Sequence, residues 1–168
     1  MGLTRQMIPD GVVEPKERNS IVKPFLMSHG TLECFNLNES RRFYEEFLGL
    51  ESVRHAPLGM AVRLGLRFHV ICLEVGDKLQ PVSLGNHWGV DVESKEKVDE
   101  AYQNAIKYKE RYNIREIGHP TLQHGAYSFY MKDLDHNWWE IQYIPNFLHD
   151  DLFDFGDVFG SDGQSLTS

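Results

Sequence analysis

The sequence predicts an α+β fold in which one order of elements, β-α-β-β-β, occurs twice along a chain of 168 residues. Strand-like and helical segments follow one another in the same order in both halves of the chain. The halves also share a register, because His29 and His87 hold corresponding places in the two leading strands. Each of them is followed fifteen residues later by a helical tyrosine, Tyr44 or Tyr102. We therefore expect two tandem modules of the same fold.

The first module is expected to begin with a strand over residues 25–35, in which alternate residues such as His29, Thr31 and Glu33 share one face. A helix follows, with Asn38 or Ser40 as its expected N-terminal cap. Apolar residues then recur at helical spacing before a glycine that suits a helix end: Phe43, Phe47, Leu48 and Gly49. Three further strands are expected over residues 51–56, 60–65 and 68–75.

The second module repeats this order. A strand is expected over residues 84–92, and Ser94 is the expected cap of the next helix. That helix carries one apolar stripe, made of Val98, Ala101, Tyr102, Ala105 and Tyr112. Three strands follow near residues 113–118, 126–132 and 137–144.

The expected boundaries place the first module at residues 23–80 and the second at residues 81–146, within one structural domain. Residues 1–22 have scattered charges without periodicity and are expected to form an N-terminal arm. Residues 147–168 mix acidic residues with phenylalanines and are expected to form a C-terminal tail.

The composition is that of an ordinary globular protein, with 41% hydrophobic and 25% charged residues. Its 17 basic and 25 acidic residues give a net charge of −8, which argues against nucleic acid as a partner. No apolar run approaches the roughly 20 residues of a membrane span, and no secretory signal is evident. We expect a cytoplasmic protein without a membrane partner, in which Cys34 and Cys72 are buried, reduced thiols.

Three residues carry the expected chemistry: His29 and His87 on the leading strands and Glu140 on the final strand. Two imidazoles and one carboxylate bind a divalent metal and leave coordination positions open, as in non-haem iron oxygenases. Apolar neighbours make an unpaired Glu140 carboxylate costly, so a cation beside it is a natural solution. In the alternative interpretation each histidine is a hydrogen-bonded core residue and Glu140 pairs with Arg63 or Arg67.

Three segments resemble the vicinal oxygen chelate superfamily, which includes glyoxalase I, fosfomycin- and bleomycin-resistance proteins and type I extradiol dioxygenases. They are Ser28–Glu33, Asn86–Asp91 and, most specifically, Tyr130–Glu140. The resemblance covers about residues 25–145. It implies paired βαβββ modules whose mixed sheet curves around a metal held by His29, His87 and Glu140.

The chain departs from the family pattern at two places. Leu134 and His136 stand where the family hairpin usually has proline and glycine, so His136 must adopt a turn conformation that glycine adopts more easily. Glyoxalase relatives also bring a second carboxylate from the last strand of the first module. The aligned place falls near His69 or Val70, and Glu74 lies too late, so a three-ligand site is expected.

The resemblance to extradiol dioxygenases rests on His124 and Phe129-Tyr130, with Glu140 ten residues beyond Tyr130. It implies catalytic roles for His124 as proton donor, with His119 as the second choice, and for Tyr130 as a hydrogen-bond donor to the bound substrate. As alternatives, His124 belongs to a loop and Tyr130 packs on the sheet. Four aromatic residues are expected to line the substrate pocket: Trp88, Tyr127, Phe129 and Trp138.

The sequence thus favours an Fe(II) dioxygenase that opens the ring of a catechol-like vicinal diol with O₂. A second hypothesis is a glyoxalase-like lyase, isomerase or epimerase that uses Zn, Mn, Ni or Co and a base such as Glu74. A third is a metal-free module that sequesters a ligand. Fold alone does not distinguish these functions. A homodimer is the expected assembly, and the two modules can close a site within one chain or be exchanged between chains.

Overall fold

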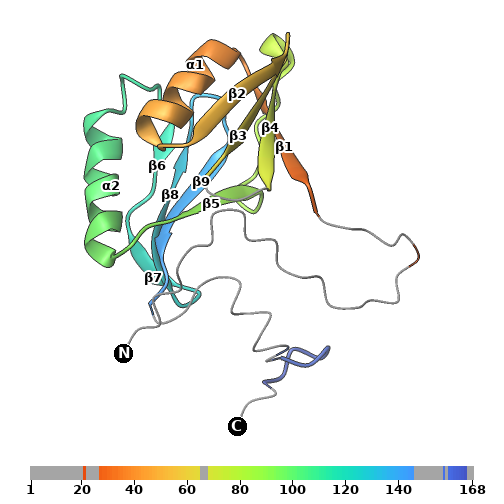
Figure 1. Ribbon diagram of the computed structural model, residues 1–168. Helices are drawn as coiled ribbons and strands as arrows, with labels where there is room; N and C mark the ends of the chain where they lie inside the picture. The colour runs from red at the N-terminus through yellow and green to blue at the C-terminus, as the bar shows by residue number, and fades with distance from the viewer. Residues whose placement is uncertain (1–20, 22–26, 65–67, 146–156, 158, 166–168) are drawn as a thin grey trace.

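The computed structural model describes residues 21, 27–64, 68–145, 157 and 159–165. It contains two mixed β-sheets, one from each half of the chain. Helices α1 and α2 lie toward one side of the molecule, and strands β1 and β4 lie at the other side (Figure 1). The α+β class and the repeated order of elements are confirmed.

The first module forms a four-stranded sheet in the order β1-β4-β3-β2. Strands β1 and β4 are parallel, whereas the other pairs are antiparallel. Its elements are β1 (His29–Cys34), α1 (Leu37–Arg42), a π-helical turn η1 (Phe43–Phe47), β2 (Glu51–Ala56), β3 (Gly59–Arg63) and β4 (His69–Glu74).

The second module forms a sheet in the order β5-β9-β8-β6, and a short strand β7 also pairs with β8. After a connecting turn, η2 (Gly76–Lys78), its elements are β5 (His87–Asp91), α2 (Lys95–Lys107), β6 (Glu116–Ile117), β7 (Thr121–Gln123), β8 (Ala126–Lys132) and β9 (Trp138–Tyr143). One feature differs from expectation. Strand β7 was not predicted, because its three residues are too few to show a periodicity.

The first helix starts earlier than expected. Its N-terminal cap is Asn36, whose side chain accepts hydrogen bonds from the backbone N–H groups of Asn38 and Glu39. Ser40 is instead buried and bonds to the second module, so neither predicted cap is correct. Gly49 ends the helical segment with a φ of 71°, as predicted from the preference of glycine for the left-handed region.

The second helix follows its prediction more closely. Ser94 caps it, and Val98 and Ala105 are buried on its inner face. The helix ends at Lys107, before Tyr112, because the chain turns away and Tyr112 packs against the first module.

A single hydrophobic core joins the two modules. The Tyr44 ring lies 5.7 Å from the Trp139 ring, and the Phe43 ring lies 6.3 Å from the Tyr112 ring, measured between centroids. Cys34 and Cys72 are free thiols buried in this core, as predicted. The modules therefore share one apolar interior and stabilise one another through its burial.

The β8–β9 hairpin owes its shape to Asp133. One oxygen of this fully buried carboxylate accepts hydrogen bonds from the backbone N–H groups of Asp135 and Asn137, both at 2.9 Å. The other oxygen accepts from the Trp139 indole N–H at 2.9 Å. His136 takes the left-handed conformation in this turn, with a φ of 63°, as its replacement of glycine required.

The same hairpin attaches the second module to the first. The Asp135 carboxylate accepts hydrogen bonds from the Phe35 backbone N–H at 2.8 Å and from the Ser40 hydroxyl at 2.6 Å. The Asn137 side chain donates to the Glu33 carbonyl at 2.9 Å. The segment that resembles the superfamily most specifically therefore also forms the polar junction between modules.

Of the expected N-terminal arm only Ile21 is described, and of the expected C-terminal tail residues 157 and 159–165 are described. Within the tail, Phe159 and Ser165 form an isolated antiparallel bridge. None of the helices in the described ranges is long and apolar enough to cross a membrane.

The buried Asp133 predicts a pH-dependent stability. Burial, followed by the charge of Asp135, raises its pKa from 3.8 to about 7. The folded protein then holds a proton that the unfolded chain releases above about pH 4, so this residue's contribution to the free energy of unfolding falls as the pH rises from about 4 to about 7. The expected loss over that range is a few kcal/mol.

Urea unfolding of the wild type and Asp133→Asn across this pH range measures the effect. The wild type should have the larger free energy of unfolding at pH 4, because an amide offers only one oxygen to the three N–H donors. This difference in the free energy of unfolding should narrow toward pH 7, where the wild-type carboxyl begins to lose its proton. The exposed Asp77→Asn is the control. A difference between wild type and Asp133→Asn that stays constant with pH contradicts the prediction.

Candidate functional site

Strand β9 separates the core from a polar face because its side chains alternate between the two sides of the sheet. Trp139 and Ile141 belong to the core cluster. Glu140 therefore points to the other face. Its cross-strand neighbours are Gly89 in β5 and Tyr130 in β8.

Glu140 and His87 converge on this polar face. The His87 Nε2 atom lies 3.3 Å from a Glu140 carboxylate oxygen, and the two side chains are 31% and 11% exposed. They come from different strands, and the parallel register of β5 and β9 brings them together. The structure thus brings together two of the three predicted metal ligands.

The hydrogen bonds of His87 show which ring nitrogen is available. Its Nδ1 atom lies 2.9 Å from the Leu84 carbonyl oxygen, which can only accept, so Nδ1 carries the hydrogen. A neutral His87 then directs the lone pair of Nε2 at the Glu140 carboxylate. Two electron-rich atoms at this distance repel one another unless a proton or a metal cation lies between them.

The separation of these two atoms fits a metal site. A nitrogen and an oxygen that bind one cation at 2.0–2.2 Å, at angles between 90° and the tetrahedral angle, lie about 2.8–3.6 Å apart. The observed 3.3 Å falls within this range. A carbonyl that fixes the imidazole tautomer is also a usual support for a metal-binding histidine.

Two successive hydrogen bonds hold the second oxygen of Glu140. The buried Ser128 hydroxyl donates to it at 2.6 Å, and the Gln123 amide donates to the Ser128 oxygen at 3.0 Å. Sequence reasoning missed both residues. The alternation of β8 could have found Ser128, because it lies two residues from Tyr130 and so shares its face.

Tyr130 lies beside this pair. Its ring is 5.1 Å from the His87 ring in an edge-to-face arrangement. Burial, together with a hydrogen bond to Glu140, raises the pKa of Tyr130 to about 12. The phenol therefore keeps its proton at neutral pH and serves as a hydrogen-bond donor at the site.

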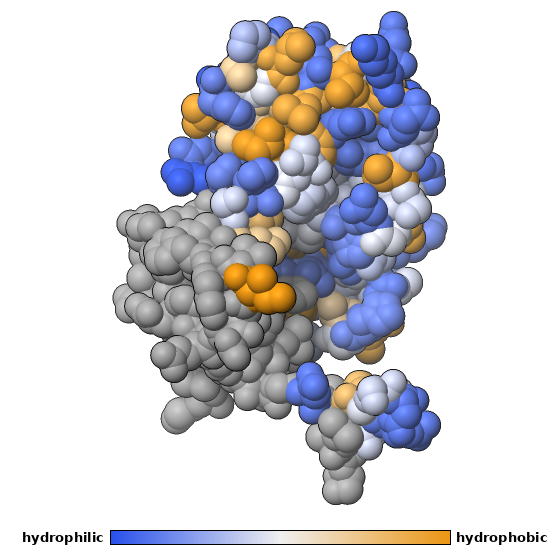
Figure 2. Space-filling model, turned by 90° about the vertical axis from the view of Figure 1, so that its right-hand side faces the viewer, coloured by the Kyte–Doolittle hydropathy of each residue, from blue (hydrophilic) through white to orange (hydrophobic). Residues whose placement is uncertain are grey.

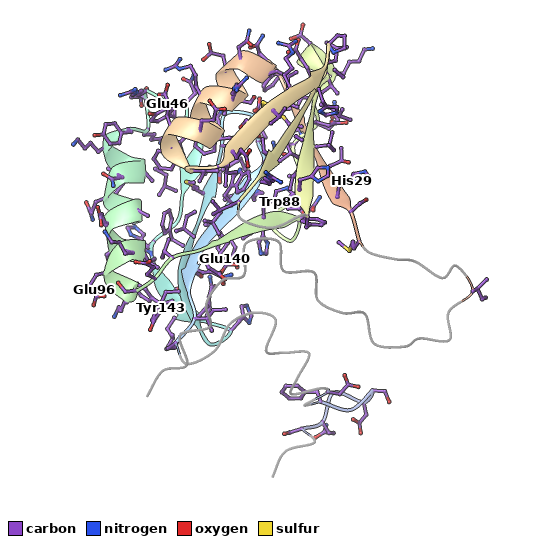
Figure 3. All side chains as sticks on the ribbon, in the orientation of Figure 1. His29, Glu46, Trp88, Glu96, Glu140 and Tyr143 are labelled. Atoms are coloured by element: carbon purple, nitrogen blue, oxygen red, sulfur yellow. The ribbon has the colours of Figure 1, made fainter. Side chains whose placement is uncertain are left out.

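His29 lies apart from Glu140 within one chain, at the outer end of β1 (Figure 3). Its exposed ring stacks on His69, the neighbouring residue in β4, with centroids 5.9 Å apart. Within the described ranges, no three His, Cys, Asp or Glu side chains gather closely enough to hold a metal. The three-residue metal site stays a prediction that a single chain does not complete.

The register of the first sheet places Ile71 at the position that corresponds to Glu140. Glu140 of β9 pairs with Gly89, two residues after His87, and Ile71 of β4 pairs with Thr31, two residues after His29. The corresponding residue is therefore Ile71 and not His69 or Val70 as expected, and its apolar side chain offers no metal ligand. Glu74, the suggested base of the second hypothesis, accepts a hydrogen bond from the Leu37 backbone N–H at 2.8 Å and so supports the start of α1.

The four aromatic residues expected around the substrate lie on both sides of the second sheet. Phe129 is buried in the core, and Tyr127 donates a hydrogen bond to Asp99 of α2 at 2.8 Å. Neither lies on the face of Glu140, because odd-numbered residues of β8 face α2. Trp138 does share that face, where the Lys132 ammonium lies 4.5 Å from its ring centroid.

Trp88 has a different role. Its ring lies against Gly30 of β1, where a Cβ atom would come within 2.3 Å of it. This close approach requires glycine and packs β5 of the second module against β1 of the first (Figure 3). The ring also lines a small cavity of about 240 Å³ with Asn86 and Asn137.

The two histidines considered as proton donors also have structural roles. His124 and Gly125 form the two-residue turn between β7 and β8, both with positive φ, at 51° and 81°. His124 is exposed at this turn. His119 pairs through Nδ1 with the Tyr102 hydroxyl of α2 at 2.8 Å, on the side away from Glu140. Of the two arginines considered as partners of Glu140, Arg63 pairs with Glu51 at 2.7 Å, and Arg67 lies outside the described residues.

Comparisons with known proteins identify the fold. No profile of a known protein family matches the sequence, and no curated protein matches it. Solved structures do match. A genomically encoded fosfomycin resistance protein from Listeria monocytogenes is 23% identical with a TM-score of 0.55, and the match covers 70% of this chain and 91% of that chain.

Two further structures have the same architecture. A lactoylglutathione lyase from Agrobacterium tumefaciens is 19% identical with a TM-score of 0.51, covering 72% of this chain and 95% of that chain. A glyoxalase/bleomycin resistance protein/dioxygenase from Alicyclobacillus acidocaldarius is 20% identical with a TM-score of 0.52, covering 70% and 89%. The TM-scores show a shared fold, and sequence identities this low leave the reaction open.

The exposed turn predicts how the His124→Asn variant behaves. Asparagine suits the first position of a two-residue turn with positive φ, so the variant should be as stable as the wild type or more stable by a few tenths of a kcal/mol. Metal content and turnover should also stay close to those of the wild type. Thermal unfolding, metal analysis and steady-state kinetics measure these three quantities. A loss of turnover of about tenfold or more at unchanged metal content would instead support proton donation by His124.

Proposed function

We propose that this chain, which has the fold of the vicinal oxygen chelate superfamily, is an enzyme that depends on a divalent metal. His87 and Glu140 would hold the metal together with His29 from a second copy of the chain. The observation that carries the proposal is the facing of the His87 Nε2 lone pair and a buried carboxylate. A metal-free binding module would instead leave this pair as a protonated imidazole beside a carboxylate, so retained metal is the measurement that separates the two functions.

The proposed second copy rests on the surface around His29. The outer face of the first sheet carries this exposed imidazole together with Val53 and Leu73, which are 54% and 38% exposed. Figure 2, seen from the side of β1 and β4, shows apolar side chains gathered over the upper part of this face. An exposed apolar face of this kind is typical of a subunit interface. A homodimer would bury it and bring each His29 to the site of its partner.

Of the possible reactions, we favour ring cleavage of a catechol-like vicinal diol by O₂. A divalent cation supplies Lewis acidity toward two substrate oxygens, and Fe(II) also supplies the redox chemistry that activates dioxygen. Tyr130 would donate its phenol hydrogen to one of these oxygens. Ser128 would hold the Glu140 carboxylate in place, and Trp138 would offer a flat apolar surface on the same face. The three-ligand set that follows from Ile71 supports this reaction, since it leaves room for both diol and O₂.

A lyase or isomerase that uses Zn, Mn, Ni or Co is the second candidate. The exposed position of His124 favours it, because ring cleavage was expected to use His124 as its proton donor. Polarisation of a carbonyl and transfer of one proton would need only the metal and a nearby base or acid, such as Tyr130.

Metal analysis after anaerobic purification, followed by oxygen-electrode assays over a panel of catechols, separates these candidates. Bound iron and catechol-dependent oxygen uptake would support the dioxygenase. Turnover of a carbonyl substrate, such as the hemithioacetal of a 2-oxoaldehyde, which keeps its second carbonyl group, under strict anaerobiosis with another divalent metal bound would support the lyase. A protein that retains no divalent metal contradicts both.

The Tyr130→Phe variant tests the role of the phenol. The metal content should remain that of the wild type, because Tyr130 is not a ligand, whereas kcat should fall by roughly one to three orders of magnitude, as for other lost donors to a reacting oxygen. The matched control is Tyr127→Phe, which removes a hydroxyl from the opposite face of the same strand. Equal kinetic effects of the two substitutions would refute the assignment.

Mixing two inactive variants tests the shared site. His29→Ala and Glu140→Ala should each lose the metal when pure. A random mixture of the two chains should recover about a quarter of the wild-type metal, because half of the dimers then have one intact site of two. The control mixture of His87→Ala with Glu140→Ala should recover none, since both losses fall on the same half of each site. No recovery in the first mixture would mean that His29 is not contributed by a second copy.

A further inference from the structure

A second cavity lies on the side of the second sheet opposite to Glu140. It has a volume of about 350 Å³ and opens between the end of the first helical segment and α2. Ile141 and Val90 form part of its wall, and they follow Glu140 and Gly89, which belong to the polar face. The cavity is therefore separated from the proposed metal site by the sheet itself. Figure 3 shows Glu46, which lines this cavity, well away from Glu140.

The lining of this cavity divides into an apolar part and a polar part. The apolar part consists of Phe47, Leu48, Val90, Val92, Ala101 and Ile141. The polar part includes Glu46, Asn104 and Arg111. Small-molecule sites typically combine such an apolar wall with a few polar groups, have volumes of about 300–1,000 Å³ and lie between structural units. This cavity has all three properties.

The polar end of the cavity offers guanidinium donors to a ligand. One Glu46 oxygen accepts hydrogen bonds from the Arg111 guanidinium and from the Tyr112 hydroxyl, both at 3.0 Å. The Arg42 guanidinium lies 4.0 Å from the other oxygen and pairs more closely with Glu39, at 3.3 Å, so the charges around Glu46 are balanced. The anion preference therefore depends on the donors of Arg111 that Glu46 does not use. The Arg111 guanidinium has five N–H groups arranged as a fork, which suits a second carboxylate.

The backbone at this cavity is also unusual. Residues Phe43–Phe47 form a π-helical turn, in which the Leu48 N–H donates to the Phe43 carbonyl at 3.1 Å. Such single turns are rare and occur frequently at functional sites. This turn carries Glu46 and Phe47, one from each part of the lining, into the cavity wall.

We propose that this cavity binds a small amphipathic carboxylate. Its apolar chain or ring lies among Val90, Ala101 and Ile141, and its carboxylate pairs with Arg111. The volume accommodates roughly ten to fifteen non-hydrogen atoms at ordinary packing density. The site is independent of the proposed metal and of the second copy, because both modules of one chain form it.

Octanoate and octylamine, which share a chain and differ in charge, are suitable probes for isothermal titration calorimetry. Octanoate should bind to the wild type with a 1:1 stoichiometry and a Kd of about 1 mM or lower, and octylamine at least about tenfold more weakly. No saturable binding of octanoate, or equal affinity for the two probes, would overturn the proposal.

Three variants locate the binding. Ala101→Phe fills the cavity and should abolish octanoate binding, with circular dichroism as the check on folding. Arg111→Gln should weaken binding by about tenfold or more, whereas Lys109→Gln, which removes a neighbouring exposed charge, should not change it. Binding that is unchanged in Arg111→Gln overturns the proposal even if Ala101→Phe fails to fold.

The Glu140→Gln variant excludes binding at the other face. Octanoate should bind to it as it binds to the wild type, because Glu140 lies across the sheet from the cavity. Loss of octanoate binding in this variant would show that the carboxylate binds at the proposed metal site and would overturn the assignment to the cavity.

Discussion

The alternation of side chains along β9 is the constraint on which the rest of the structure depends. Trp139 and Ile141 face inward and join the core that the two modules share, which forces Glu140 to the opposite face. Because β9 lies between β5 and β8, that carboxylate is flanked by His87 on one side and by Ser128 and Tyr130 on the other. The same strand therefore stabilises the fold and positions the polar site, and it does so without a loop. Rigid placement of this kind suits metal ligands, whose positions must be accurate to a few tenths of an ångström.

The hairpin before β9 fixes this strand relative to the first module. Asp133 closes the turn through three N–H donors, and Asp135 binds the backbone and a side chain of the first module. Two buried acidic side chains are costly, and their cost is offset because each of their four oxygens accepts a hydrogen bond. The segment that most resembles the superfamily is therefore a structural device as well as the carrier of Glu140. The presence of this segment is evidence for the fold. The short distance between His87 Nε2 and the Glu140 carboxylate is separate evidence for a metal site.

The two faces of the second sheet present different chemistry. The face of Glu140 is polar and, in one chain, lacks the imidazole of His29, which lies on an exposed surface with apolar neighbours. The opposite face is apolar and forms one wall of a cavity that lies within one chain and opens between α2 and the π-helical turn. A metal site shared between copies and a ligand cavity inside each copy would be separated only by the thickness of one sheet. Neighbouring residues of β9, Glu140 and Ile141, would then belong to two separate sites on opposite faces of the sheet.

The sequence by itself determined the order of elements, the duplication and the three candidate ligands, because strand alternation, helix caps and repeated histidines are local patterns. It also determined that His136 would need a left-handed turn. Only the tertiary structure decided that Phe129 belongs to the core, that Ser128 supports Glu140, and that His29 lies apart from Glu140 within one chain (Figure 3). These facts depend on the register between strands and on how the two modules pack. Such contacts join residues far apart in the chain, and no local pattern encodes their distances.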